Sequence, residues 1–404
     1  MFYLCIQMSK QNAPPFIEPW IDPTGWNIED FANIETPCYV VSENRLEQNL
    51  KILQYVQETS GCRILAALKS FSMFSVFPLM KQYLAGAEAS SVFEARLGAT
   101  EFGGEVHTFS PSYTEDNIHD YIQYSDHLVF NSFSQWNRFK ETIRNSPKKV
   151  SCGIRVNPEH CETETPMYDP CGPNSHFGIT LANFEPQNLV GIEGIHFHNL
   201  CELNADSLQR TLKVVEEKFG AYFAQMKWIN FGGGHHITRR DYDIDLLCNI
   251  IIDFKKRYPH LQEYLEPGEA VALNAGVLVA SVVDVLKNGM DIAVLDVSAT
   301  THMPDVLEMP YLPTILGTGH EPDKYIYRLV GPTCLTGDVI GNYSFPAPLT
   351  IGQKLVFLNM AVYTMVKNNT FNGVNLPSIA IMSKDGNIKT IREFGYEDFK
   401  MRLS

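Results

Sequence analysis

The stretch RILAALKSF, residues 63–71, ends an apolar, strand-like run with a single lysine, Lys69. An amine at a rigid strand end, shielded from water by apolar neighbours, has a lowered pKa and can attack an aldehyde carbon. A lysine that closes a buried strand can equally be a surface residue, whose stem packs on the apolar run while its ammonium stays in water. The rest of the chain has to decide between these two interpretations.

Short apolar runs recur along the first two thirds of the chain, and helix-like stretches separate them. The runs cover 63–68, 127–130, 149–156, 191–196 and 227–231, and clear helical stretches cover 43–58 and 206–219. Alternating strands and helices favour a parallel sheet, and this number of units favours a closed barrel, with functional residues on the loops after the strands. Four residues fall at or just after such strand ends: Lys69, Arg155, His198 and Gly232.

The pattern changes after Pro267. Runs at 277–285, 292–297, 325–330, 354–357 and 378–382 are typical of strands separated by turns, with almost no helical periodicity. The sequence therefore predicts a second domain that is a β-sandwich or β-barrel.

Composition limits the class of protein. With 404 residues and 45% hydrophobic content, the chain can form two or three domains. It has no apolar run of the roughly 20 residues that a membrane span needs, and residues 1–10 do not resemble a secretory signal. Nine cysteines without CxxC spacing indicate reduced thiols, so we expect a cytoplasmic protein. A net charge of −14 argues against a nucleic-acid partner and permits a cationic small molecule.

Five motifs follow Lys69 along the chain. They are GIHFH (194–198), NFGGG (230–234), LEPG (265–268), GPTC (331–334) and AVYT (361–364). In this order they resemble the alanine-racemase-fold decarboxylases, which use pyridoxal 5'-phosphate (PLP), from about Glu35 to the C-terminus. Within that family FGGGHHIT (231–238), LEPGEAV (265–271) and HMPDVLEMPY (302–311) are most similar to the carboxynorspermidine decarboxylases.

The resemblance implies an α/β plus β fold, in which a TIM-type (β/α)8 barrel carries the cofactor and a β-sandwich or β-barrel domain follows. We expect an N-terminal arm over 1–34, a segment at 35–45 whose strand joins the β domain, the barrel over 46–268, and the β domain over 269–404. The arm contains four prolines and can be partly disordered.

The same resemblance implies roles for the cofactor site. Lys69 would bind PLP covalently, His198 would stack on its ring, and Glu266 would hold the ring nitrogen protonated, which strengthens the electron sink that decarboxylation needs. The backbone of Gly232, Gly233 and Gly234 can approach a phosphate closely, with Tyr363 as a further donor. Arg155 and Glu88 match polar positions around the lysine. A tight turn, a core tyrosine and a capping glutamate are the alternative interpretations of these features.

Histidine pairs raise the question of a metal. His196 and His198, like His235 and His236, have the spacing or adjacency that a metal site can use, but the sequence shows no third ligand near either pair. We therefore predict no metal.

In the resembling enzymes the Gly-Pro-Thr-Cys segment reaches the active site of the partner subunit. Cys334 would then return a proton to the α-carbon and Asp338 would help to hold the substrate, so catalysis would need a homodimer. A buried structural thiol is the alternative for Cys334.

Two departures from the ornithine-type pattern bear on the substrate. An arginine that follows Glu-Pro-Gly in those enzymes is Glu269 here, and a serine is Cys201, so two phosphate contacts are missing. Glu269 and Asp305 could instead pair with substrate ammonium groups, although surface acids without such a role are also possible.

Together these features predict decarboxylation of carboxynorspermidine, and also of carboxyspermidine, to norspermidine and spermidine in polyamine biosynthesis. Three alternatives stay open: a decarboxylase of diaminopimelate or another basic amino acid, a non-catalytic polyamine-regulatory homologue, and a metal-dependent hydrolase on a similar barrel.

Overall fold

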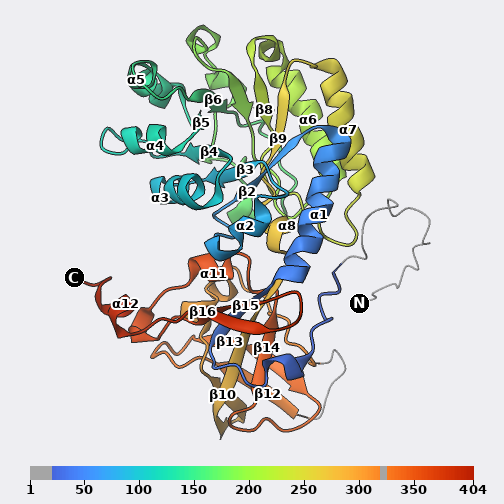
Figure 1. Ribbon diagram of the computed structural model, residues 1–404, viewed down its shortest axis with the longest axis vertical. Coiled ribbons are helices and arrows are strands. Elements are labelled where there is room, and N and C mark those ends of the chain that lie inside the picture. Colours follow the sequence, from blue (N-terminus) through green and yellow to red (C-terminus); the bar gives the residue numbers. More distant parts are fainter. Residues whose placement is uncertain (1–20, 319–324) are drawn as a thin grey trace.

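The computed structural model describes residues 21–318 and 325–404, and it contains two domains (Figure 1). A helix-covered barrel occupies the upper half of the view and a sheet domain the lower half. The expected combination of a (β/α)8 barrel with a β domain is confirmed.

Eight parallel strands close the barrel in chain order, and β2 completes the ring by pairing with β9. The strands are β2 (Arg63–Ala67), β3 (Gly86–Ala89), β4 (Glu105–Ser110), β5 (His127–Phe130), β6 (Ser151–Arg155), β7 (Gly194–His196), β8 (Trp228–Asn230) and β9 (Gln262–Leu265). The helices around it are α1 (Glu43–Ser60), α2 (Phe77–Met80), α3 (Val92–Leu97), α4 (Ile118–Tyr124), α5 (Phe133–Arg144), α6 (Ala205–Phe219), α7 (Ile244–Arg257) and α8 (Gly268–Ala272). Among the described residues, no helix is both long and apolar enough to cross a membrane.

Helix α1 shows how local sequence sets these elements. The Ser42 hydroxyl accepts a hydrogen bond from the amide of Arg45 and starts the helix, and Gly61, at φ 74°, ends it. Between them Leu46, Leu50 and Leu53 recur at helical spacing and are fully buried in the main core of the barrel domain.

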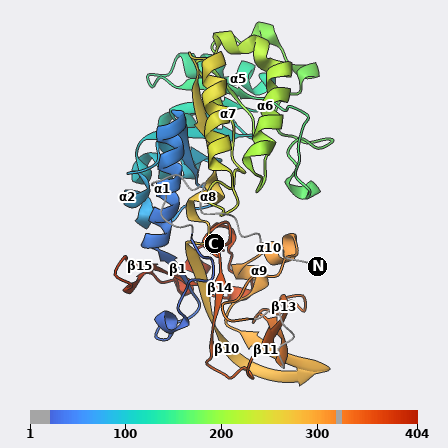
Figure 2. The same cartoon turned by 90° about the vertical axis from the view of Figure 1, so that its right-hand side faces the viewer.

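The second domain is one mixed sheet in the order β13-β12-β11-β10-β1-β15-β16, with β14 paired to β10. The strands are β1 (Cys38–Ser42), β10 (Gly276–Asn288), β11 (Met290–Leu295), β12 (Tyr325–Val330), β13 (Val339–Phe345), β14 (Lys354–Leu358), β15 (Ser378–Met382) and β16 (Ile388–Arg392). Short helices α9 (Ala299–His302), α10 (Asp305–Glu308), α11 (Thr364–Lys367) and α12 (Tyr396–Lys400) interrupt it. Figure 2 shows the long β10 and β11 at the end far from the barrel.

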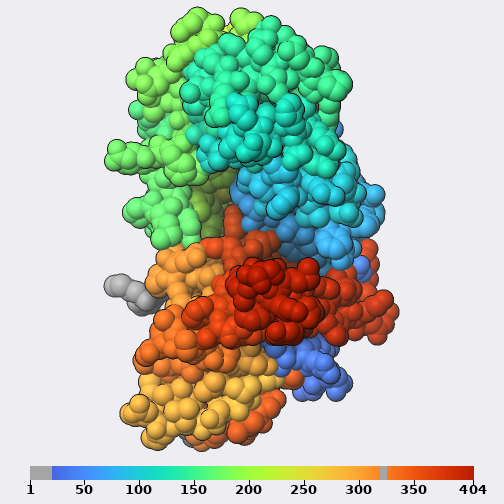
Figure 3. Space-filling view, turned by 90° about the vertical axis from the view of Figure 1, so that its left-hand side faces the viewer, coloured from blue at the N-terminus to red at the C-terminus, as the bar shows by residue number. Residues whose placement is uncertain are grey.

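Strand β1 lies between β10, which it meets antiparallel, and β15, which it meets in parallel. The chain therefore contributes one strand to the sheet domain, builds the whole barrel, and then returns to finish the sheet. On one face of the molecule the C-terminal residues (red) lie directly below the barrel residues coloured blue (Figure 3).

The expected arm is described only from residue 21, and residues 1–20 lie outside the described part of the chain. Trp26 and Phe31 are buried against the sheet domain beside Cys38 and Val40. The guanidinium of Arg45 lies 4.1 Å from the centre of the Trp26 ring. Residues 21–34 thus pack on the β domain.

Candidate active site

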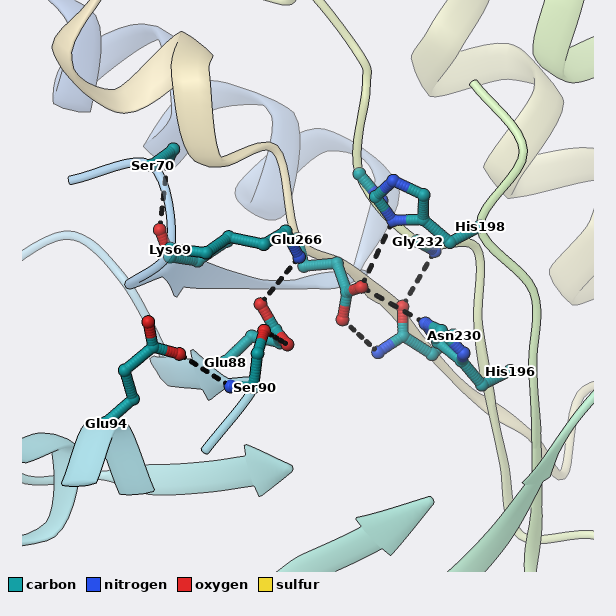
Figure 4. Close-up of polar contacts among 12 residues, drawn as sticks. Lys69, Ser70, Glu88, Ser90, Glu94, His196, His198, Asn230, Gly232 and Glu266 are labelled. Carbon is teal, nitrogen blue, oxygen red and sulfur yellow. Dashed lines mark hydrogen bonds and ion pairs between the residues drawn. The ribbon is translucent and has the colours of Figure 1, made fainter. Parts of the chain in front are cut away.

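Lys69 follows the last residue of β2, and its ammonium donates a hydrogen bond to Glu88 Oε2 on β3 at 2.9 Å (Figure 4). The predicted lowering of its pKa is wrong. Burial does favour the neutral amine, but the charges of Glu88 and Glu266 outweigh burial and raise the pKa of Lys69. The sequence could not show this, because Glu88 reaches the lysine from the neighbouring strand.

Glu266 is the centre of the polar network in Figure 4. It follows β9, and its side chain is only 3% exposed. His196 Nε2 lies 3.1 Å from Oε1, and the Asn230 amide donates to Oε2 at 3.0 Å. Burial alone would raise the pKa of Glu266, but His196 and Lys69 hold it well below its usual range. Glu266 is therefore an ionised carboxylate at neutral pH.

His198 lies just after β7 and presents a neutral ring. The amide of Gly233 donates to Nδ1 at 2.9 Å, so the ring proton of the neutral form is on Nε2. Burial lowers the pKa of His198 to about 3. A neutral imidazole of this kind can stack on another flat ring without adding charge.

Arg155 ends β6 and is almost fully buried. Its guanidinium lies between two aromatic rings, 4.4 Å from the centre of Phe109 and 4.7 Å from that of Phe177. It donates to the carbonyl oxygen of His198 at 3.1 Å, which fixes the backbone of that residue. Burial lowers the pKa of Arg155 to about 10, so it keeps its charge.

The glycine triplet forms a tight cradle after β8. Gly232 and Gly234 have φ values of 75° and 80°, and a side chain on Gly234 would come within 1.9 Å of the Leu200 carbonyl oxygen. Two of the three amides already have protein acceptors, since Gly232 donates to Asn230 Oδ1 and Gly233 to His198. Only the Gly234 amide makes no hydrogen bond within the described part of the chain, and it remains available to an anion.

Tyr363 comes from the other domain. Its backbone has a φ of 52°, and its amide donates to the carbonyl oxygen of Ser70, next to Lys69, at 2.8 Å. Burial raises the pKa of the Tyr363 phenol to about 12. The hydroxyl therefore keeps its proton and can donate it to a ligand in the site.

These residues line one cavity of about 990 Å³ between the barrel and the sheet domain. Its wall includes Lys69, Glu88, Arg155, His198, Gly234, Glu266 and Tyr363, together with Cys201, Glu202, His235, His236, Glu269 and Asp305. Both ring nitrogens of the buried His235 lack a hydrogen-bond partner among residues 21–318 and 325–404. Unsatisfied buried donors beside a cavity are consistent with a polar ligand.

Glu269 and Asp305 both line this cavity, and each already has a cationic or imidazole neighbour. Glu269 Oε2 lies 3.2 Å from Nε2 of His236. Asp305 is ion-paired with Lys367 of α11. Their predicted contacts with substrate stay predictions.

Cys334 and Asp338 lie away from the cavity, in the turn between β12 and β13. Cys334 is exposed, and its amide donates to Asn372 Oδ1 at 2.7 Å. Asp338 is 2% exposed, and its carboxylate accepts hydrogen bonds from Ser298, Thr300 and Thr333. With these contacts Asp338 anchors the turn that presents Cys334, and its oxygens face protein donors.

The sequence missed His196 and Asn230 as partners of Glu266. The sequence shows no third metal ligand near His196 and His198. In the structure Glu266 takes that position, because the ligand atoms of His196, His198 and Glu266 all lie within 4.8 Å of one another. Asn230 takes the second oxygen of Glu266, and the Gly233 amide takes the lone pair of His198 Nδ1. Protein N–H groups thus already donate to Glu266 Oε2 and His198 Nδ1, two of the atoms that could bind a metal.

The donor set fits PLP. Lys69 offers an amine, His198 a flat neutral ring, Glu266 an ionised carboxylate, and Gly234 with Tyr363 free donors for a phosphate. The fold and this site define a PLP-dependent enzyme of the barrel-plus-sheet architecture.

Comparison with known proteins specifies the family. A family model described as "Pyridoxal-dependent decarboxylase, C-terminal sheet domain" matches residues 38–361. The chain is 42% identical over 384 residues to carboxynorspermidine/carboxyspermidine decarboxylase of Campylobacter jejuni, covering 92% of this chain and 99% of that protein. It is also 42% identical over 374 residues to carboxyaminopropylagmatine decarboxylase of Synechocystis, covering 92% and 96%. The chain belongs to the family of pyridoxal-dependent decarboxylases.

Solved structures agree with this assignment. The crystal structure of carboxynorspermidine decarboxylase from Campylobacter jejuni, complexed with norspermidine, has a TM-score of 0.85 and 42% identity, and covers 91% of this chain and all of that one. Diaminopimelate decarboxylase from Helicobacter pylori, complexed with L-lysine, has a TM-score of 0.78 at 18% identity, with 93% and 99% covered, and shows the shared fold alone.

Proposed function

We propose that this PLP-dependent decarboxylase acts on a carboxylated polyamine, with carboxynorspermidine and carboxyspermidine as its substrates and norspermidine and spermidine as products. The observation that carries the proposal is the charge of the cavity. Its wall carries six carboxylates, Glu88, Asp169, Glu202, Glu266, Glu269 and Asp305, against three cationic side chains, Lys69, Arg155 and Lys367. A net negative cavity suits a chain with several ammonium groups.

The residues of the chain divide the work of the reaction. Bound PLP supplies an electron sink for the pair left behind when carbon dioxide departs. Lys69 holds the cofactor through its amine, and Glu266, kept ionised by His196 and Lys69, stabilises a proton on the ring nitrogen. His198 supports the ring face, and Arg155 fixes the backbone of His198.

Cys334 serves a neighbouring subunit in this proposal. Its side chain is exposed and lies outside the cavity of its own chain, so its thiol can supply a proton to the α-carbon only in another copy. The active unit is then a homodimer with shared sites. Protein donors already hydrogen-bond to the carboxylate oxygens of Asp338. These contacts support a positioning role for Asp338 in the turn that carries Cys334, in place of the predicted substrate contact.

Glu269 and Asp305 are the proposed partners of substrate ammonium groups. Glu202 lies on the same wall, where burial and the nearby Glu269 raise its pKa. Because like charges are close together here, an ammonium between Glu202 and Glu269 would relieve their repulsion.

A second candidate substrate is carboxyaminopropylagmatine, on which the Synechocystis relative acts by name. Its guanidinium end is also cationic, so the charge of the cavity does not separate the two. Diaminopimelate fits less well, because its far end carries a second carboxylate that the acidic wall would repel. We further propose a cytoplasmic location, which the unpaired state of all eight described cysteines supports.

The decisive experiment measures carbon dioxide release by the PLP-loaded protein on carboxynorspermidine, carboxyspermidine, carboxyaminopropylagmatine, diaminopimelate, ornithine and arginine. We expect the highest kcat/KM with carboxynorspermidine or carboxyspermidine, and a loss of at least about 10³-fold in Lys69→Ala. If carboxyaminopropylagmatine gives the highest kcat/KM, the proposed substrate changes and the proposed roles of the residues stay the same. Preference for an amino acid would refute the polyamine proposal.

A further inference from the structure

Lys367, the last residue of α11, joins two acids of α10, of which Asp305 lines the cavity. Its ammonium forms ion pairs with both Asp305 and Glu308, the first and last residues of α10. The Lys367 side chain is 33% exposed, whereas that of Asp305 is 18% exposed. Asp305 and Lys367 both face the cavity that contains Lys69. Asp305, one of the acids on this wall, therefore already holds an alkylammonium group supplied by the protein.

The surroundings of Asp305 suit such a cation. Tyr168 and Tyr311 also line the cavity near Asp305. Burial and the charge of Asp305 raise the pKa of both phenols, that of Tyr311 to about 12. A carboxylate between aromatic side chains binds alkylammonium groups through charge and through the ring faces.

We propose that Lys367 is a specificity-determining residue: between Asp305 and Glu308 its ammonium occupies the position that the distal ammonium of the substrate takes. This inference rests on the proposed function and deepens it. The amine of Lys367 and the end of a polyamine are the same chemical group, a primary ammonium on an alkyl chain. The substrate end displaces Lys367, which moves toward solvent on its flexible four-carbon stem.

The exchange has a consequence for selectivity. A ligand with a cationic end must compete with Lys367 for the two carboxylates, so its affinity is lower than the acids alone would allow. The far end of diaminopimelate carries both an ammonium and a carboxylate, and its carboxylate would be attracted by Lys367 and lose that partner when Lys367 is removed. Removing Lys367 should therefore improve binding of polyamines and should not improve binding of diaminopimelate.

The test measures norspermidine binding by calorimetry to the full-length, PLP-loaded protein and to Lys367→Met. We expect the variant to bind norspermidine about 3- to 10-fold more tightly, because the Lys367 ammonium no longer competes with norspermidine for Asp305 and Glu308. Lys384→Met is the matched control. It removes a similarly exposed ion pair, with Glu47, outside the cavity, and should leave the affinity unchanged.

Two further variants keep the inference falsifiable. Lys367→Arg retains the charge and should show no gain, and Asp305→Asn should weaken norspermidine binding. Unchanged or weaker binding by Lys367→Met, or by Lys367→Gln if the methionine variant does not fold, would refute the exchange while the proposed function stands. Norspermidine that binds neither the wild type nor any variant would refute the proposed function itself.

Discussion

Two clusters of identical composition lie at opposite ends of the same barrel. Each contains two histidines and a glutamate with ligand atoms within 4.8 Å of one another: His196, His198 and Glu266 at the carboxyl ends of the strands, and Glu105, His107 and His127 at the amino ends. Only the first group lines the cavity. The two clusters contain the same residue types, so any difference in their function comes from their surroundings.

At the amino end the cluster is packed as core. The rings of His107 and His127 stack with their centres 3.8 Å apart and an interplanar angle of 17°. Glu105 pairs with Arg63, and Tyr264 donates to its Oε2 at 3.0 Å. Aromatic rings and an arginine thus fill the space that a ligand would need.

The pKa of the glutamate does not distinguish the two ends. Burial would raise both, yet His107 and Arg63 lower the pKa of Glu105 to about 2, and His196 and Lys69 lower that of Glu266. Both carboxylates are therefore ionised. The first cluster is a candidate active site because it opens on the cavity and lies near Lys69, and the second, which does not line the cavity, is a structural one.

The largest effect should come from Glu266→Gln, which removes the charge at the active end. We expect kcat to fall by about 100-fold, because a neutral amide cannot stabilise a proton on the ring nitrogen. Steady-state carbon dioxide release at saturating substrate gives the value. A kcat within threefold of the wild type would contradict the assigned role.

His196→Phe tests the positioning of that carboxylate. Without the N–H of His196 the pKa of Glu266 should rise, so the acidic limb of the kcat–pH profile should move to higher pH, and kcat near pH 7 should fall about 5- to 10-fold. His107→Phe at the opposite end is the control and should leave the limb in place. If the acidic limb moved equally in His196→Phe and His107→Phe, the shift would come from a general disturbance of the barrel, and the role assigned to His196 would be wrong.

Glu105→Gln should affect stability and spare catalysis. Replacing the carboxylate leaves Arg63 without its partner, and because Arg63 is 41% exposed we expect a loss of only about 1–2 kcal/mol in the free energy of unfolding. Urea unfolding measures this loss, and kcat should stay within twofold of the wild type. A drop in kcat as large as that of Glu266→Gln would remove the distinction between the two ends.

The smallest effect concerns acid stability. Burial and His107 lower the pKa of His127 to about 3 in the folded protein, below the usual 6.5. Between these values the unfolded chain binds a proton that the folded chain does not, so stability falls as the pH drops, by up to about 1.4 kcal/mol per pH unit. His127→Phe should make the loss between pH 6.5 and 4.5 smaller. An unchanged slope in urea unfolding would assign the acid sensitivity to other groups.

The order of the motifs and the family resemblance that it carries predicted the fold and the cofactor. Three of the motifs, GIHFH, NFGGG and LEPG, lie at the ends of barrel strands, and the barrel brings these strand ends together. Contacts between strands were not predictable. His196 and Asn230 reach Glu266 from β7 and β8, and the acids that raise the pKa of Lys69 come from β3 and the end of β9. The pairing of Lys367 with Asp305 joins two short helices that have no periodic sequence pattern.

The position of β1 has a consequence for how this protein is made. Cys38–Ser42 is synthesised near the start of the chain, but its parallel neighbour, Ser378–Met382, is synthesised near the end. During translation the whole barrel emerges from the ribosome before the central strand of the sheet can pair on both sides. Completion of the sheet is therefore a late, long-range step of folding. Until β15 is made, the apolar strand β1 has at least one edge without a hydrogen-bonding partner.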